Sequence, residues 1–359
     1  MGDISREQVL AQLSTVLDPE LHKDIVTLDM VKDVVIDGST VGLVLELTTP
    51  ACPLKEVIKE DVDQAVKRLP GVTTVSVEWS ARVRSSLPSS LTLPGVKNIV
   101  AVGAGKGGVG KSTAAVILAY GLRRSGASVG LMDADVYGPS IPKMTGIDGV
   151  TPQVANNMII PPTARGVKVI SVGFMIEHDK PLIWRGPMVH SVVRQFLEQV
   201  EWGELDYLIV DLPPGTGDVP LTLAQSIPMT GAVIVCTPQD VALADARRAV
   251  RMYQQLKVTC LGIIENMSYY LCPSCGHRDE LFDHGGARAA AAELGVPFLG
   301  DIPLNTRVRV YGDSGSPEKI LTETDDYVAE AVASVVANTA GQISVRSEVA
   351  MATAKVQTR

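Results

Sequence analysis

Hydrophobic and polar residues alternate along two stretches near the start of the chain, at residues 31–36 and 41–47. Strict alternation is typical of strands with one buried face, and Asp37-Gly38 between them is a common hairpin turn. Around this hairpin the pattern predicts a helix that starts at Ser5-x-x-Gln8, a capping-box sequence, and ends near Leu17. We therefore expect a small α+β domain over residues 1–80.

A further helix and a closing strand complete the prediction for this first domain. The helix is expected over residues 54–68 and the strand over residues 72–79. Cys52 lies just before the predicted helix, where the helix dipole would lower the pKa of a thiol. A single cysteine is more often a small buried hydrophobic residue, so Cys52 is a lesser candidate.

From residue 98 the pattern changes to short, continuous apolar runs separated by helical periods. Runs such as Tyr207-Leu-Ile-Val-Asp211 do not alternate, which indicates strands buried on both faces in a mostly parallel sheet covered by helices. The expected strands are 98–103, 128–133, 167–172, 206–211, 231–236, 260–266 and 297–302. The expected helices are 112–124, 188–200, 219–227, 241–257, 285–295 and 324–338.

These patterns predict two domains, a linker and a tail. Residues 81–97 are rich in serine and proline and have no clear period, so we expect a linker. Residues 98–340 form the predicted α/β domain. Residues 341–359 are polar and aperiodic, which predicts a flexible tail.

Composition narrows the functional classes. The 359 residues carry a formal net charge of -8, which argues against nucleic acid as the main partner. No apolar run reaches the ~18 residues of a membrane span, and the first ten residues lack the features of a signal peptide. We expect a cytoplasmic protein without a membrane partner. Five cysteines in that setting point to metal or redox chemistry rather than a disulfide framework.

The segment with the most specific chemistry is Gly105-Lys106-Gly107-Gly108-Val109-Gly110-Lys111-Ser112-Thr113, which fits the phosphate-binding loop pattern G-x-x-x-x-G-K-[ST]. Its glycines let backbone N–H groups converge on phosphate oxygens, and the helix expected to start near Ser112 adds its positive end. Lys111 is placed to bind the β- and γ-phosphates, and the Ser112 hydroxyl to bind Mg²⁺. Lys106 could point toward a partner's phosphates, which suggests a nucleotide-dependent dimer.

A competing interpretation of the same segment is a dinucleotide-binding loop, since Gly103-x-Gly105-x-x-Gly108 fits that glycine pattern. That fold expects an acidic residue about 20 positions further on, whereas Asp133 and Asp135 lie roughly 25 to 30 positions on. The Gly110-Lys111-Ser112 ending is absent from the dinucleotide pattern and favours the phosphate-binding loop.

Acidic residues end two of the predicted strands. Asp211 follows an apolar run and precedes Leu212-Pro-Pro-Gly-Thr-Gly-Asp218, the position at which nucleotide hydrolases hold Mg²⁺ directly or through water. Asp133 and Asp135 lie two residues apart on an extended chain and therefore face the same side. We expect Asp133 to tune the metal shell and Asp135 to orient the attacking water. Asn266, after a later strand, could pair with a purine edge.

Cys272-Pro-Ser-Cys275 is a C-x-x-C pair that places two thiolates on one edge of a metal site. A closed site needs four ligands and the chain has no second C-x-x-C, so the economical solution is a two-fold dimer with four cysteines between subunits. Zinc and a [4Fe–4S] cluster both fit, and His277 could substitute for one ligand. A redox dithiol is the weaker alternative. Cys236 and Cys260 lie in apolar strands and are expected in the core.

Taken together and in order, these motifs resemble the Mrp/ApbC family of iron–sulfur cluster carrier ATPases, within the MinD/ParA/ArsA deviant-Walker superfamily. The motifs also include Trp184-Arg-Gly-Pro187 and Glu265-Asn-Met-Ser268. Asp18-Pro-Glu20, Asp24-Ile-Val26 and Thr49-Pro-Ala-Cys52-Pro53 resemble the small domain of SufT- and PaaD-like assembly factors.

This resemblance implies a homodimer that binds ATP and Mg²⁺ between facing phosphate-binding loops and hydrolyses ATP slowly. It implies a labile [4Fe–4S] cluster on the paired C-x-x-C loops, passed to apo iron–sulfur proteins with assembly factors as partners. Lys106 would match a lysine acting across the dimer, Asp135 the switch I acid and Asn266 an adenine contact. The resemblance also strengthens Cys52 as a candidate ligand.

Two other classes of function remain as alternatives. One is a positioning ATPase of the partition or septum type, with a structural zinc at the dimer interface, although the tail lacks a strong membrane-binding face. The other is a redox ATPase similar to the nitrogenase iron protein, which uses single, widely separated cysteines rather than C-x-x-C.

Overall fold

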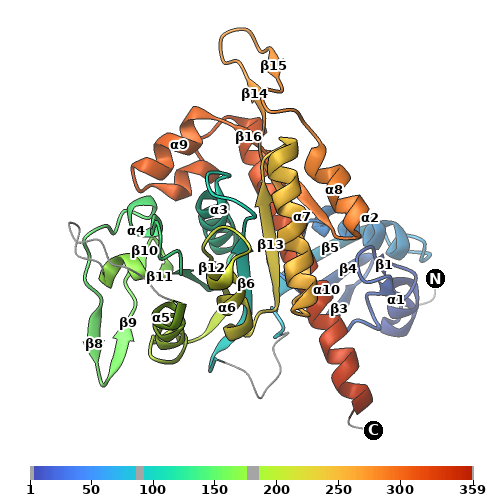
Figure 1. Cartoon of the computed structure of the whole chain (residues 1–359). Coiled ribbons are helices and arrows are strands. Elements are labelled where there is room, and N and C mark those ends of the chain that lie inside the picture. Colours follow the sequence, from blue (N-terminus) through green and yellow to red (C-terminus); the bar gives the residue numbers. More distant parts are fainter. Residues whose placement is uncertain (1–3, 86–92, 176–185, 358–359) are drawn as a thin grey trace. The chain divides into compact units, whose positions relative to one another are not determined.

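The computed structural model describes residues 4–85, 93–175 and 186–357 (Figure 1). The chain divides into two compact units, residues 1–84 and residues 85–359. Residues 86–92 of the expected linker lie outside the described residues.

Unit 1 is a three-stranded sheet with two helices, as the alternating pattern predicts. Helix α1 (Arg6–Leu13) starts with the expected capping box, in which the Ser5 side chain accepts from the Gln8 N–H and the Gln8 side chain accepts from the Ser5 N–H. The sheet order is β3-β4-β5, with β3/β4 antiparallel and β4/β5 parallel. The elements after α1 are β1 (Leu17–Asp18), β2 (Lys23–Asp24), β3 (Val31–Asp37), β4 (Thr40–Leu47), α2 (Lys55–Val66) and β5 (Thr74–Ala81).

The core of unit 1 forms where the helices cover one face of this sheet. Every second residue of β4 is buried, beginning with Val41 and Leu43, and these side chains pack with Val9 of α1 and with Ile58 and Val62 of α2. The alternation of residues 41–47 thus gives one face to the core.

Unit 2 is built on a large, mostly parallel sheet with the order β10-β11-β7-β12-β6-β13-β14-β15, and β16 also pairs with β14. The neighbouring strands β11, β7, β12, β6, β13 and β14 are all parallel, as is the pairing of β14 with β16. Strand β10 pairs antiparallel with β11, and β15 pairs antiparallel with β14. The strands are β6 (Val96–Gly103), β7 (Val129–Asp133), β10 (Thr163–Ala164), β11 (Val167–Ser171), β12 (Leu205–Asp211), β13 (Gly231–Cys236), β14 (Cys260–Leu271), β15 (Arg278–Asp279) and β16 (Phe298–Leu304).

Helices cover both faces of this sheet. One cluster joins alternate strand residues such as Ile99 and Leu208 to side chains of α5, α6, α7 and α8, for example Phe196 and Val250. Helices α3 and α10 pack against each other and against strands of the same sheet, α3 mainly against β7 and β12 and α10 mainly against β16. The helices are α3 (Lys111–Arg124), α4 (Ile141–Met144), α5 (Gly186–Glu198), α6 (Asp218–Ser226), α7 (Asp240–Gln255), α8 (Gly286–Leu294), α9 (Thr306–Asp313) and α10 (Asp326–Gln357), with 3-10 turns at Val172–Met175 and Pro317–Leu321. A small hairpin, β8 (Gln153–Ala155) and β9 (Met158–Ile160), completes the unit.

The expected fold class, a parallel sheet flanked by helices after a small α+β domain, is confirmed. The register matters for function because the carboxyl ends of β7, β12 and β11 are level: Asp211 pairs with Asp133, and Asp133 with Ser171. The loop after β6 starts at the same edge. Segments that are far apart in the sequence therefore meet there.

The expected flexible tail is wrong for the described part of residues 341–357. Helix α10 continues through them to Gln357, and Ile343, Ser344 and Ser347 are buried at helical spacing. The two serines bury their hydroxyls by donating to the carbonyls of Ala340 and Ile343 within the helix, so polar residues do not end it. Among the described residues, none of the helices combines the length and the apolar character needed to cross a membrane.

Candidate functional site

The phosphate-binding loop connects β6 to α3, and close approach or backbone conformation requires glycine at Gly105, Gly108 and Gly110. Gly108 and Gly110 have φ of +81° and +82°, a region that favours glycine. A Cβ on Gly110 would collide with the side-chain amide of Asn266, and one on Gly105 would collide with the backbone of Asp245. Helix α3 begins at Lys111, so its N-terminal N–H groups face the loop as expected.

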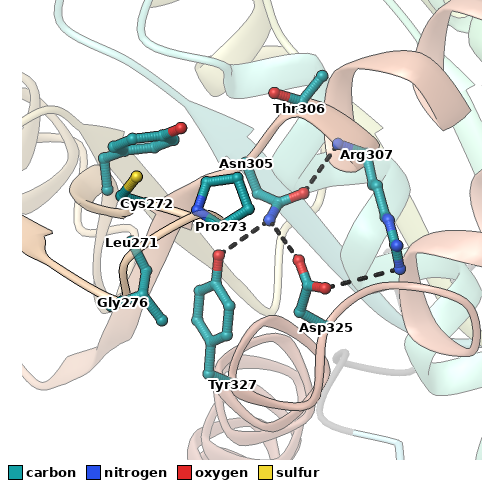
Figure 2. Close-up of a pocket in the computed structure, with 10 residues that line it drawn as sticks. Leu271, Cys272, Pro273, Gly276, Asn305, Thr306, Arg307, Asp325 and Tyr327 are labelled. Atoms are coloured by element: carbon teal, nitrogen blue, oxygen red, sulfur yellow. Dashed lines mark hydrogen bonds and ion pairs between the residues drawn. The ribbon is translucent and has the colours of Figure 1, made fainter.

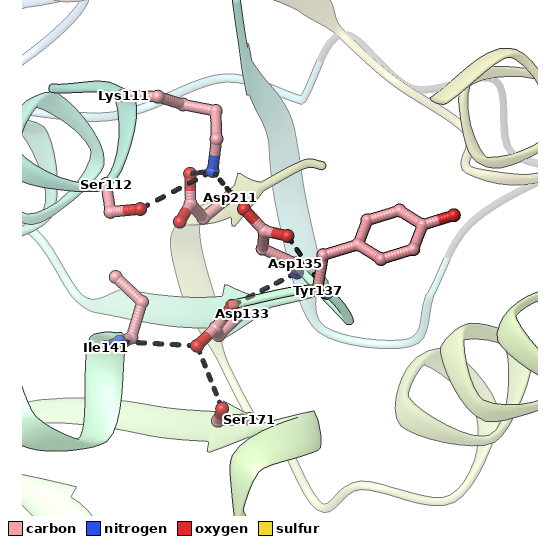
Figure 3. A network of polar contacts seen from close by, with 8 residues as sticks. All are labelled: Lys111, Ser112, Asp133, Asp135, Tyr137, Ile141, Ser171 and Asp211. Atoms are coloured by element: carbon pink, nitrogen blue, oxygen red, sulfur yellow. Dashed lines mark hydrogen bonds and ion pairs between the residues drawn. The ribbon is translucent and has the colours of Figure 1, made fainter. Parts of the chain in front are cut away.

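Lys111 is the centre of a buried polar network (Figure 3). Its Nζ lies 2.6 Å from Asp211 Oδ1 and 3.2 Å from Asp135 Oδ2, and it donates to Ser112 Oγ at 3.4 Å. Lys111 is 6% exposed, Asp211 0% and Asp135 7%. The structure thus brings together four of the predicted site residues at the carboxyl edge of the sheet.

Asp133 lies deeper and shapes the loop that carries Asp135. Its Oδ1 accepts from the Asp135 N–H at 3.1 Å, and its Oδ2 accepts from Ser171 Oγ at 2.9 Å and from the Ile141 N–H at 3.3 Å. Asp135 in turn accepts from the Tyr137 N–H through Oδ1 at 3.2 Å. Both oxygens of Asp133 are therefore engaged by the protein.

Burial and mutual repulsion change the pKa values of this network. Burial, together with the nearby Asp211 carboxylate, raises the pKa of Asp133 to about 8. Burial also raises the pKa of Asp211, against the opposing effect of Lys111. For Lys111, burial lowers the pKa, but the Asp211 and Asp135 carboxylates outweigh it and the net pKa is raised. Lys111 is therefore charged at neutral pH.

The network fits a bound Mg²⁺. The Asp211 and Asp135 carboxylates, both buried, share the single Lys111 ammonium group, an excess of negative charge that a divalent cation would balance. Asp211 Oδ2 is buried and has no hydrogen-bond partner among the described residues, whereas both oxygens of Asp133 have partners. The free oxygen of Asp211 and the nearby Ser112 hydroxyl are the donor types that Mg²⁺ prefers.

Asn266 reaches the phosphate-binding loop from β14. Its Nδ2 donates to the Val109 carbonyl at 2.8 Å, and the side chain is 6% exposed. In this structure it contacts the loop backbone, and its expected role at a purine edge stays a prediction. Lys106 is half-buried in the same loop, and Thr113 lies in the first turn of α3.

The C-x-x-C pair lies at the tip of a hairpin formed by β14 and β15, which extends from the sheet (Figure 1). Leu271 pairs with Arg278, and the turn closes with Cys272 N–H donating to the His277 carbonyl and Gly276 N–H to the Cys272 carbonyl, each at 2.9 Å. Cys272 is half-buried and Cys275 is exposed. Gly276 has φ +69°, a conformation the turn requires.

This turn favours the thiolate of Cys272. Backbone hydrogen bonds from Ser274 and Cys275, followed by one from the Cys275 side chain, lower the pKa of Cys272. Within the described residues, no group of three or more His, Cys, Asp or Glu side chains is arranged to hold a metal, so His277 does not complete a site here. Two thiols from one chain are half of a four-ligand site.

The remaining cysteines differ from one another. Cys236 and Cys260 are buried as expected. The expected lowering of the Cys52 pKa is wrong: burial raises it to about 11, with Glu20 and Asp18 adding to the effect, although the Leu54 N–H opposes it. Asp18 ends β1 and Glu20 lies in the turn after it, and sequence spacing did not place either carboxylate beside Cys52.

Sequence reasoning missed some polar partners. Ser171, which holds Asp133, is a polar residue at the end of a buried strand, and that signal could have found it. Glu265 is fully buried and accepts from the Gly285 and Ala287 N–H groups at the start of α8, at 2.9 and 2.8 Å. The spacing of residues along the sequence could not predict that Glu265 contacts the start of α8. Trp184 and Arg185 of the quoted motif lie outside the described residues.

A family model described as NUBPL iron-transfer P-loop NTPase matches residues 95–340, and one described as iron-sulfur cluster assembly protein matches residues 6–78. The chain is 50% identical to an iron-sulfur cluster carrier protein of Synechocystis, covering 95% of this chain and 98% of that protein. It is 49% identical to an iron-sulfur cluster carrier protein of Deinococcus radiodurans, covering 95% and 96%.

Solved structures add two similarities. A nucleotide-binding protein of Archaeoglobus fulgidus in complex with ADP is 39% identical with a TM-score of 0.58, covering 66% of this chain and 92% of that one. The cell division ATPase MinD of Pyrococcus furiosus is 20% identical with a TM-score of 0.50, covering 67% and 97%, a likeness of fold.

Proposed function

The chain belongs to the family of NUBPL iron-transfer P-loop NTPases, and from that premise we propose that it is an ATP-hydrolysing homodimer that carries a [4Fe–4S] cluster to apo-proteins. The main support for the proposal is the course of strand β14. This one strand presents Asn266 to the phosphate-binding loop and ends at the exposed C-x-x-C turn. One continuous strand therefore connects a residue that contacts the phosphate-binding loop to the thiol pair that follows the strand.

In the nucleotide half, the backbone N–H groups of residues 105–113 would cradle the phosphates of ATP. Lys111 would move from its carboxylate partners to the β- and γ-phosphates, where its positive charge stabilises the charge that develops during transfer. Ser112 and Asp211 would hold Mg²⁺, with Asp133 behind them; the ion supplies charge neutralisation on the phosphate oxygens.

Two residues are assigned to the hydrolysis step. Asp135 becomes available when Lys111 leaves it, and its position on the loop after β7 suits it to orient the attacking water and take its proton. Lys106 is assigned to the phosphates of a second copy, which is the reason that hydrolysis would need a dimer. Asn266 is assigned to the base.

In the cluster half, Cys272 and Cys275 would supply two ligands and the same pair of a second copy the other two. The cluster is cargo, so partial exposure of the pair at the hairpin tip favours its release to an apo-protein. The lowered pKa of Cys272 favours the thiolate that iron requires. Cys52 is a further candidate ligand in unit 1, and its raised pKa makes it the weaker one.

The test is anaerobic reconstitution with iron and sulfide, followed by iron, sulfide, zinc and mass measurements per dimer. We expect about four irons per dimer, since four cysteines close one cubane. The Cys272→Ser/Cys275→Ser variant should lose the cluster while it keeps ATP binding, and Cys260→Ala is the matched control that should keep both. One zinc per dimer without a cluster would contradict the proposal and favour a positioning ATPase held together by a structural metal.

The nucleotide half is tested by phosphate release. Lys111→Ala should lower the ATPase rate at least about 100-fold, as the loss of a charge that acts on the transferring phosphoryl group does. Lys106→Ala should lower the rate without preventing ATP binding. Normal turnover in the Lys111 variant would contradict the assignment of the loop.

A further inference from the structure

A cavity of about 410 Å³ lies directly beside the C-x-x-C turn in unit 2 (Figure 2). Three separate segments form it: the end of β14 with the turn, the connection from β16 into α9, and the start of α10. Its volume is in the range of sites that bind small molecules, roughly 300 to 1,000 Å³. None of the roles given above uses this cavity.

One wall of the cavity is a preorganised polar cluster. Asn305 Nδ2 donates to Asp325 Oδ2 and to the Tyr327 hydroxyl, at 3.0 Å each, and Asn305 Oδ1 accepts from the Arg307 N–H at 2.8 Å. A single amide therefore links two of the three segments, the connection into α9 and the start of α10. Such a wall needs little reorganisation when a ligand binds.

This wall carries one cation and one anion. Arg307 Nη1 lies 3.6 Å from Asp325 Oδ1 and donates to the Glu323 carbonyl at 3.1 Å. Among the described residues, the side-chain contacts of Arg307 all use Nη1, so Nε and Nη2 can donate to a carboxylate. Asp325 can accept from an ammonium group. The side chains are 55% and 44% exposed, so the pair is loose enough to accept a ligand between them.

The other end of the cavity carries a thiol. Leu271, Cys272 and Pro273 line it, and in Figure 2 the Cys272 sulfur lies on the opposite side of Pro273 from the Arg307 guanidinium. A ligand that fills the cavity would thus hold its charged groups at Arg307 and Asp325 and bring another group next to Cys272.

We propose that this cavity binds a low-molecular-weight thiol that carries ionised carboxylate and ammonium groups, and presents its sulfur next to Cys272. The inference rests on the proposed function, because it makes the thiol an exchange partner for the cluster. The thiol gives its proton to solvent, its thiolate forms a bond to the iron that Cys272 holds, and the Cys272–iron bond breaks. The Cys272 thiolate then takes a proton from solvent, so no oxidation state changes.

Binding is tested on the full chain without a cluster, by titration calorimetry with glutathione. We expect saturable binding with one site per chain, and the same affinity for S-methylglutathione, which keeps the charges but has no free thiol. Arg307→Gln should weaken both about tenfold or more, the effect of one lost charge-assisted hydrogen bond. Arg309→Gln is the matched control, because Arg309 is on the same helix, pairs with Asp313 and does not line the cavity.

Exchange is tested on the reconstituted chain, by the rate at which the cluster moves to an apo-acceptor. Glutathione should raise this rate along a saturation curve that Arg307→Gln shifts to about tenfold higher concentration, and S-methylglutathione should compete. A linear dependence, equal to that with 2-mercaptoethanol, would overturn the proposal, as would absence of binding to the cluster-free chain. In both cases a chain that still carries and transfers its cluster leaves the proposed function intact.

Discussion

The ion pair between Lys111 and Asp211 gives the sharpest prediction, because its partners are almost completely buried. Lys111→Met removes the ammonium and leaves Asp211, at 0% exposure, and Asp135, at 7%, without their cation. Breaking a buried pair from one side costs about 3–5 kcal/mol, since the remaining charge is desolvated and unpaired. Uptake of a proton by Asp211 offsets part of this cost, so we expect about 3 kcal/mol at neutral pH.

The double variant Lys111→Met/Asp211→Asn restores the charge balance and should recover stability to within about 1 kcal/mol of the parent chain. It should not recover ATP binding, because the phosphates still lack their lysine. A more exposed pair on β6 and β12 serves as the comparison: Lys97 and Asp206 are 2.8 Å apart, and their side chains are 39% and 17% exposed. Lys97→Met should cost less than about 1 kcal/mol.

The assay is a urea titration in buffer free of Mg²⁺ and nucleotide. Unfolding is monitored by pulsed hydrogen exchange of peptides from β6 and β12, because these strands report on unit 2. A loss of 3 kcal/mol shifts the midpoint by about 1 M or more at the usual urea slopes. The predicted cost of leaving Asp211 unpaired is refuted if the single variant is as stable as the parent, or if the double variant is no more stable than the single one.

Other predictions address the glycine loop and unit 1. Gly110→Ala should destabilise the chain by about 2 kcal/mol or more and abolish ATP binding, because φ is +82° and the new Cβ meets Asn266; unchanged nucleotide affinity in a binding titration would contradict this. Alkylation by iodoacetamide at pH 7, followed by mass spectrometry, should modify Cys272 well before Cys52, whose pKa is raised to about 11. Burial raises the pKa of Glu20 to about 7, so the unfolded chain releases this proton first and stability should fall between about pH 4.5 and 7. In urea unfolding, Glu20→Gln should remove this pH-dependent loss of stability, which is on the order of 1 kcal/mol after solvent screening. If the variant keeps the pH profile of the parent, Glu20 is not the group responsible.

Much of the nucleotide site could be predicted from the sequence because Asp133 and Asp211 end strongly apolar strands and the phosphate-binding loop directly follows another. In a parallel sheet such positions meet at one edge, so the level register of Asp211 and Asp133 follows from the fold class. The cavity beside Cys272 could not be predicted in this way. It depends on Asn305 and Tyr327, which belong to segments whose distance from the turn is set by sheet order and not by any local period.

The two errors have different physical origins. Polar residues at 341–357 predicted a solvated tail, whereas Ser344 and Ser347 satisfy their hydroxyls at carbonyls four residues back in the same helix. The position of Cys52 beside a helix end predicted a lowered pKa, whereas burial and the nearby carboxylates outweigh the Leu54 N–H. A local hydrogen bond was overlooked in the first case, and the tertiary environment outweighed a local rule in the second.

The path of β14 has a consequence for how this protein tolerates insertions and deletions. Its pairing with β16 is interrupted between Asn266 and Tyr270, and Met267 there has φ +55°. Successive side chains of a strand point to opposite faces. Removal of one residue from this interval would therefore reverse the face to which the C-x-x-C turn points, while the first part of the strand stayed in place. The number of residues between the amide and the thiols is therefore more constrained than their identity, and designed variants should change composition here while they keep the length.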